Sequence, residues 1–98
     1  MWLWLSATAK AHAIPATIAA KRHQWLTQGK DQQLRVRCRS AQRYVVEQRS
    51  PAQVFWLLDT DDPDAWRLII DHFGDLWDIE VYRVTPQPLA QTPPASLP

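Results

Sequence analysis

The stretch Val54–Trp66, VFWLLDTDDPDAW, combines an apolar strand with the start of a helix. Five consecutive apolar residues, Val54–Leu58, are typical of a strand that is buried on both faces. Asp62 and Pro63 match the residue types preferred at a helix N-cap and at the first helical position. The neighbouring carboxylates also interact favourably with the positive end of a helix. The stretch therefore predicts a central strand that leads directly into a capped helix.

The segment after this stretch predicts the rest of the helix and a last strand. Apolar residues at spacings of three, four, seven and eleven form one amphipathic stripe, and Gly74 falls near its end; they are Trp66, Ile69, Ile70, Phe73 and Trp77. Residues 78–85, DIEVYRVT, then predict the closing strand. Five prolines in residues 85–98 are typical of an extended tail, so we expect residues 86–98 to be poorly ordered.

The segment before Val54 predicts two extended pieces. Residues 33–40 alternate, with Leu34, Val36 and Cys38 on one side and arginines on the other, which is the period of a strand. Residues 43–48 form a second extended piece. The pattern leaves open whether the two make a hairpin or one long bent strand.

The N-terminal part predicts one strand and one helix. Residues 2–9 are short, aromatic and modestly alternating, as in a strand, and the helical pattern from Ile14 ends at Gly29. Ala11-His12-Ala13 resembles a small-x-small cleavage site, but no basic residue precedes Lys10 and the apolar run is too short for a leader. We therefore expect a cytoplasmic protein.

The predicted order is strand, helix, strand, strand, helix, strand. A chain of 98 residues accommodates one domain. This order is that of the ferredoxin-like α+β fold, βαββαβ, in which two helices cover one face of an antiparallel sheet. We expect residues 1–85 to form this single domain.

Both faces of the predicted sheet are apolar. We expect one face to point at the helices, namely Leu3, Leu5, Phe55, Leu57, Ile79 and Val81. The other face then carries Trp2, Trp4, Val54, Trp56, Leu58, Tyr82 and Val84. An apolar surface of this extent is seldom left exposed to water, so we expect another surface to pack against it. We expect a second copy of the chain to supply it, sheet against sheet, enclosing a barrel-like cavity.

Three stretches of the chain resemble small dimeric α+β-barrel proteins, in particular muconolactone isomerases and their relatives. They are the first helix with its Ile14-Pro15 start, VFWLLDTDDPDAW, and the closing WDIEVYRVTP, within a likeness that covers most of residues 1–88. The resemblance implies a homodimer. It also implies an enzyme that moves a proton and a double bond on a lactone, using a base on the first helix. There this chain has Ala19–His23, AAKRH, and no acidic residue precedes Asp31.

Composition excludes several kinds of site. Two glycines do not provide a phosphate-cradling loop, and one cysteine excludes an internal disulfide and a multi-cysteine metal site. No apolar run reaches the about 20 residues that span a bilayer. Residues 1–49 hold nine Lys and Arg against two acids, whereas residues 50–98 hold two against eight. We expect these halves to attract each other, within the fold or across a dimer.

The candidate ligand-binding residues are aromatic. Trp2, Trp4, Trp56 and Tyr82 share the predicted second face of the sheet. There they could line a cavity for a small hydrophobic metabolite, or simply form the core of a dimer. We expect no cofactor.

The alternative function is catalytic, as an isomerase-like or monooxygenase-type enzyme. His23 is the candidate base, because its ordinary pKa lies near neutrality, and Arg43 is the candidate stabiliser of an anion. The sequence leaves the choice between enzyme and binding protein open.

Two further classes of site are weaker candidates. Arg35, Arg37, Arg39 and Arg43 could bind single-stranded nucleic acid, but charge on an edge strand explains them better. The aspartates at 59, 61 and 64 lack the spacing of a calcium loop, and the histidines lack the spacing of metal ligands. We therefore expect no metal and no nucleic-acid partner.

Overall fold

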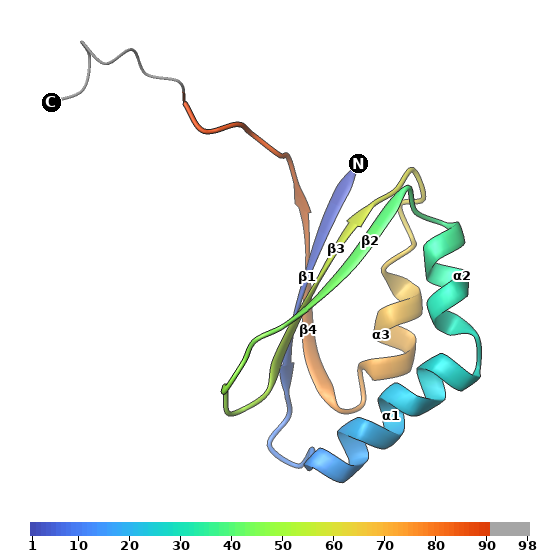
Figure 1. Ribbon diagram of the computed structural model, residues 1–98, viewed down its shortest axis with the longest axis vertical. Coiled ribbons are helices and arrows are strands. Elements are labelled where there is room, and N and C mark those ends of the chain that lie inside the picture. The colour runs from blue at the N-terminus through green and yellow to red at the C-terminus, as the bar shows by residue number, and fades with distance from the viewer. Residues whose placement is uncertain (91–98) are drawn as a thin grey trace, which may run out of the picture.

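The computed structural model describes residues 1–90 and contains a four-stranded antiparallel sheet in that range. Its elements are β1 (Trp2–Ala9), α1 (Pro15–Thr27), α2 (Lys30–Val36), β2 (Ser40–Val45), β3 (Gln53–Asp59), α3 (Arg67–Phe73) and β4 (Trp77–Val84). The strand order is β2-β3-β1-β4, and the helices of residues 1–90 all lie on one side of the sheet (Figure 1). The predicted ferredoxin-like α+β fold is confirmed, with α2 as an addition to it.

Strand β1 alternates strictly between the two faces of the sheet. Leu3, Leu5, Ala7 and Ala9 are buried toward the helices, and the residues between them are only partly buried. This pattern follows from the period of two along a strand. The prediction for β1 is confirmed.

The side chains of β3 lie on the faces of the sheet opposite to those predicted. Leu3 pairs with Leu58 and Leu5 with Trp56, so these β3 residues share the helix face with Leu3 and Leu5. Phe55 therefore lies on the other face. The error arose because VFWLL is apolar at every position, so no alternation marks its buried side, and a shift of one residue reverses every side chain.

The predicted strand over residues 33–40 is wrong. Residues 30–36 form helix α2, which follows Gly29 in the left-handed conformation (φ 70°) that glycine adopts without strain. Lys, Gln, Leu and Arg favour a helix at these positions. Leu34 alone in α2 is buried, whereas Val36 is 72% exposed, so the alternation does not mark a buried face. The extended piece of residues 43–48 is partly confirmed, because β2 ends at Val45.

The helix predicted from Pro63 is shorter than expected. Residues 63–66 form turns, and α3 begins at Arg67. The Asp62 carboxylate accepts a hydrogen bond from the Asp64 backbone N–H (2.9 Å), so it caps the turn rather than the helix. Trp77, assigned above to the helical stripe, is the first residue of β4.

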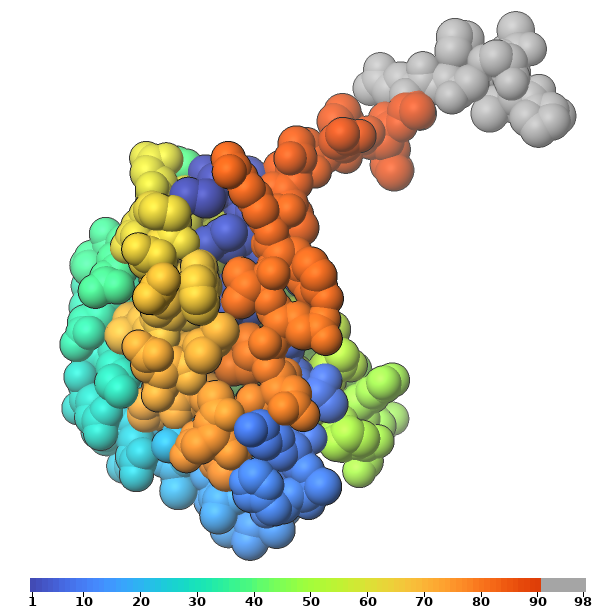
Figure 2. Space-filling model, turned by 180° about the vertical axis from the view of Figure 1, so that it is seen from behind, coloured from blue at the N-terminus to red at the C-terminus, as the bar shows by residue number. Residues whose placement is uncertain are grey.

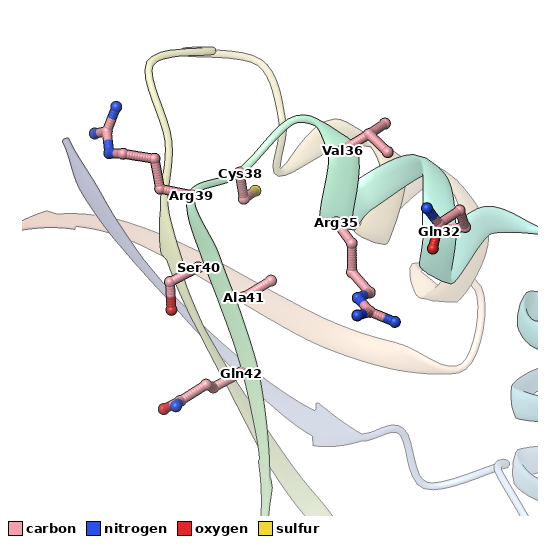
Figure 3. A pocket seen from close by; sticks show the side chains of 8 residues that line it. All are labelled: Gln32, Arg35, Val36, Cys38, Arg39, Ser40, Ala41 and Gln42. Carbon is pink, nitrogen blue, oxygen red and sulfur yellow. The ribbon is translucent and has the colours of Figure 1, made fainter.

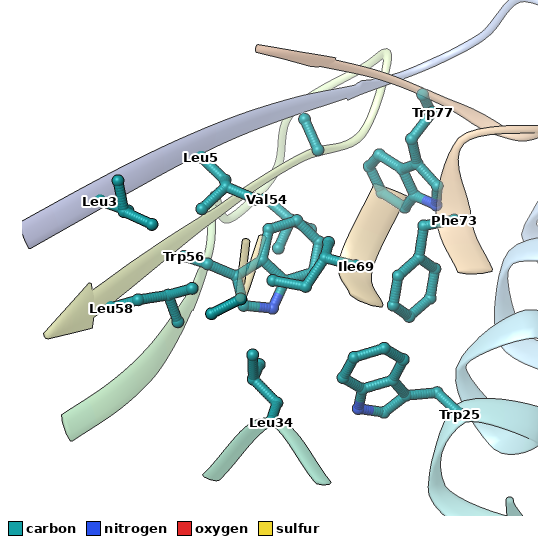
Figure 4. Close-up of a cluster of buried hydrophobic side chains, with 13 residues drawn as sticks. Leu3, Leu5, Trp25, Leu34, Val54, Trp56, Leu58, Ile69, Phe73 and Trp77 are labelled. Atoms are coloured by element: carbon teal, nitrogen blue, oxygen red, sulfur yellow. The ribbon is translucent and has the colours of Figure 1, made fainter. Parts of the chain in front are cut away.

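The core lies between the sheet and the helices (Figure 4). Trp25 of α1 is 1% exposed and packs against Phe73 of α3, with ring centroids 5.2 Å apart. Phe73 also packs against Trp56 of β3, at 5.8 Å. The aromatic chain from Trp25 to Trp56 thus attaches α1 and α3 to the sheet.

Ion pairs join the basic first half of the chain to the acidic second half. Lys21 pairs with Asp75 (2.9 Å), and Arg39 pairs with Asp59 and Asp61 (both 2.7 Å). These pairs lower the pKa of all three carboxyl groups. The expected attraction between the halves therefore operates within the fold.

The chain leaves the sheet after β4. Residues 85–90 contain no helix or strand and project away from the body of the molecule (Figure 2). The predicted tail, residues 86–98, begins in this segment, and residues 91–98 lie outside the described part. Residues 1–90 contain no helix long and apolar enough to cross a membrane.

Candidate ligand-binding face

The face of the sheet opposite the helices, here called the open face, carries three of the four predicted ligand-binding residues. Trp4 pairs with Tyr82 and Trp2 pairs with Val84 across β1 and β4. The side chains of these two pairs therefore lie on the same face of the sheet. Trp2 and Trp4 are partly buried, and Tyr82 is exposed. Within residues 1–90, no helix covers this face (Figure 1).

Trp4 is the centre of an aromatic band on the open face. Its ring stacks on Phe55 of β3 (centroids 5.0 Å apart, planes at 29°) and on Tyr44 of β2 (6.3 Å, 28°). With Tyr82 on its other side, the band crosses all four strands diagonally. Leu57, opposite Trp4 in register, adds apolar area. Such a surface favours flat apolar partners, because aromatic rings stack with an offset.

Phe55, Leu57 and Tyr44 were missed as members of this face. The first two are predicted on the helix side, because the two faces of β3 are interchanged in the prediction, and the strand that contains Tyr44 has no predicted pairing. The alternation in β1 shows which of its own residues lie on the open face. It identifies the open-face residues of β3 only when the register between the two strands is known.

Trp56 does not belong to the open face. It is 4% exposed and lies in the core on the helix side, against Phe73. Its placement on the outer face was wrong, for the reason given for β3. A ligand on the open face would have no access to it.

Polar groups border the aromatic band. The Tyr82 hydroxyl donates a hydrogen bond to the Glu80 carboxylate, and the Tyr44 hydroxyl donates to the Gln42 side-chain oxygen. The hydrogen bond to Glu80 and its negative charge raise the pKa of Tyr82. Each phenol has already donated its proton, so the hydroxyl oxygens remain as acceptors at the edge of an apolar surface.

The two candidate catalytic residues lie away from the open face. His23 is exposed on α1, which lies on the helix side of the sheet (Figure 1). Arg43 pairs with Trp56 in register, so it too belongs to the helix side. Among the hydrogen bonds and ion pairs of residues 1–90, none joins the two. The structure therefore separates them from the aromatic band.

The arginines expected on one basic strand face are dispersed. Arg35 lies on α2, Arg37 ends that helix, Arg39 precedes β2 and Arg43 lies within it. Residues 1–90 contain no group of three or more His, Cys, Asp or Glu side chains that could hold a metal ion.

Solved structures share this architecture at low sequence identity. A candidate antibiotic biosynthesis monooxygenase from Deinococcus radiodurans is 11% identical, with a TM-score of 0.54 over 94% of this chain and all of that one. A protein from Agrobacterium tumefaciens is 13% identical (TM-score 0.55; 93% and 98% covered). An ethyl tert-butyl ether d (EthD) family protein from Bacillus halodurans is 11% identical (TM-score 0.53; 87% and 100% covered).

The chain shares their fold. At this identity the likeness extends to the arrangement of the elements and no further. No protein-family model matches the sequence, and no curated protein matches it.

Proposed function

We propose that this protein is a homodimer in which the open faces of two copies meet and enclose an aromatic-lined cavity for a small hydrophobic ligand. The observation that carries the proposal is the aromatic band around Trp4, which the described part of the chain leaves uncovered. Soluble monomers seldom expose contiguous apolar patches beyond a few hundred Å². A second copy covers the patch with a surface of the same chemistry, as two-fold symmetry requires.

The first test of the proposal is the mass in solution. We expect sedimentation equilibrium to give about twice the 11.4 kDa chain mass. Trp4→Glu should give monomers, because a buried and unpaired carboxylate at the centre of the interface is strongly unfavourable. Trp66→Glu is the matched control, since Trp66 is partly buried on the helix side and should leave the dimer intact. A wild-type protein that stays monomeric at 100 µM, about the upper range of ordinary assays, would sink the proposal.

The second test concerns the ligand. N-Phenyl-1-naphthylamine is neutral, planar and apolar, and it fluoresces strongly when water is excluded. We expect saturable binding with quenching of tryptophan emission, and loss of binding in Tyr44→Glu, which places a charge at the edge of the stack. Leu26→Glu, on the exposed side of α1, should bind like the wild type. Equal binding by all three proteins would contradict the assignment of the cavity to this face.

The enzymatic alternative receives less support from the geometry. His23 and Arg43 lie on the side of the sheet away from the aromatic band, so they are poorly placed to act on a ligand held there. The monooxygenase name belongs to the Deinococcus radiodurans protein. The binding role accordingly remains the function that the open face supports best.

A further inference from the structure

A groove on the helix side of the sheet lies between α2 and the edge strand β2. It has a volume of about 430 Å³, and Figure 3 shows the side chains that line it. A smaller hollow of about 60 Å³ borders on the same residues and is lined by Asp31, Leu34, Arg43 and Trp56. The two spaces share Arg35, Ala41 and Gln42, so they form one depression that deepens toward the core.

Two arginines face the depression from opposite walls. Arg35 projects from α2 (Figure 3), Arg43 lies on the helix side of β2, and both line the smaller hollow. Neither forms an ion pair with any carboxylate of residues 1–90. Arg39, by contrast, points away from α2 (Figure 3), and Asp59 and Asp61 hold it.

The charge around the depression is unbalanced. Desolvation lowers the pKa of Arg43, the positive charge of Arg22 lowers it further, and the negative charge of Asp31 opposes the shift. Asp31 is the one carboxylate lining the depression, and it is already engaged. It accepts a hydrogen bond from the Trp25 indole N–H (2.9 Å) and lies 3.9 Å from Arg22. Three guanidinium groups therefore surround a single carboxylate.

The floor of the depression strengthens an interaction with an anion. Leu34 and Trp56 are almost fully buried there. An apolar floor keeps water away on one side, which makes a hydrogen bond between charged groups stronger than at an open surface. The guanidinium fork also matches the geometry of a carboxylate or a phosphate.

We propose that this depression binds a small organic oxyanion, a carboxylate or a phosphate ester, held between Arg35 and Arg43. The hollow that both arginines line has a volume of about 60 Å³, and the adjoining groove of about 430 Å³ is in the range of small-molecule sites. The Gln32 side chain on α2 offers a further hydrogen bond at its wall. The site is separate from the open face and does not depend on the proposed dimer.

A long polyanion fits the site less well. Asp59 and Asp61 neutralise Arg39 beside the groove, which interrupts any continuous stripe of positive charge. The chain as a whole carries a net charge of only +1, so its attraction for a nucleic acid is weak at long range.

The test is an NMR titration with two probes, succinate and inorganic phosphate, at constant ionic strength set by chloride. We expect saturable shifts confined to α2 and β2 with at least one probe, and the preferred probe identifies the class of anion. Arg35→Gln and Arg43→Gln should each weaken binding about tenfold or more, the usual effect of losing a charged hydrogen bond in a partly buried site. Arg43→Lys should retain part of the affinity.

Arg37→Gln is the matched control, because it removes the same charge from the exposed end of α2 outside the groove. It should leave the affinity unchanged. No saturable binding of either probe would overturn the proposal, as would an equal loss in the Arg37 and Arg35 variants. Tight single-stranded DNA binding weakened equally in all the glutamine variants would overturn it in favour of a nucleic-acid surface. Arg35 and Arg43 are both exposed, so both glutamine variants should fold.

Discussion

Replacing Trp25 with alanine is expected to lower the free energy of unfolding by about 3–5 kcal/mol, as truncation of a buried aromatic side chain generally does. Trp25 is the most buried residue of α1 and the only one of that helix in the core. It contacts Phe73 and His72 of α3, and its indole N–H donates to Asp31. The substitution would leave a cavity and would remove the indole hydrogen bond to Asp31. The total free energy of unfolding of a small domain is about 5–15 kcal/mol, so this variant should lose a large part of its stability.

Urea unfolding monitored by circular dichroism, at one fixed protein concentration, measures this effect. Leu26→Ala is the matched control, because Leu26 is the next residue of α1 and about half exposed. It should cost no more than about 1 kcal/mol, as is usual for surface substitutions. A loss below about 1 kcal/mol for Trp25→Ala would mean that α1 does not depend on this anchor.

Stability is expected to fall when the pH drops below about 6.5, the ordinary pKa of histidine, because His72 must stay neutral in the folded protein. His72 is 5% exposed. Its Nδ1 accepts a hydrogen bond from the Lys30 ammonium (3.0 Å), and its Nε2–H donates to the Lys21 backbone carbonyl (2.8 Å). Both ring nitrogens are therefore occupied in the neutral form. A proton on Nδ1 would confront the Lys30 ammonium directly.

The direction of the pH effect follows from the pKa of His72. Burial lowers that pKa, and the charges of Lys30 and Lys21 lower it further, whereas the hydrogen bond to the Lys21 carbonyl and the charge of Asp75 oppose the shift. The unfolded chain then binds a proton before the folded one does. Neutral His72 makes its full contribution to stability above about pH 6.5. This contribution is lost as the pH falls from there through the lower pKa that His72 has in the folded protein. Within that window one proton gives a slope of at most about 1.4 kcal/mol per pH unit.

Unfolding in urea at pH 5, 6, 7 and 8 measures the slope, and His72→Gln should abolish it. His23→Gln, which removes an exposed histidine, should leave it unchanged. The paired carboxyls Asp59, Asp61 and Asp75 titrate well below this window, because their cationic partners lower their pKa. If the His72 variant does not fold, NMR titration of the ring in the wild type decides: a pKa at or above 6.5, the ordinary value, would refute the explanation.

The predictions that succeeded rest on local patterns. The short, aromatic and modestly alternating stretch Trp2–Ala9 predicted β1 and its buried side correctly. Pro15 and Gly29 marked the limits of α1, because proline suits a first helical turn and glycine the left-handed turn after a helix. The ferredoxin-like order followed from these elements.

The predictions that failed needed information that no local pattern contains. The alternation in residues 33–40 resembled a strand, yet only Leu34 reaches the core, and good helix formers favoured α2. Trp56 was placed on the wrong face because an unbroken apolar run does not mark its buried side.

The sequence by itself determined the fold class, the limits of β1, α1 and β4 to within a residue or two, and the presence of an aromatic excess. These depend on periodicity and on residue preferences, which act between neighbours in the chain. Only the tertiary structure decided which aromatic side chains share the open face and which arginines line the same hollow. Both depend on how β3 pairs with β1 and on the return of α2 beside β2, and these contacts join residues distant in sequence.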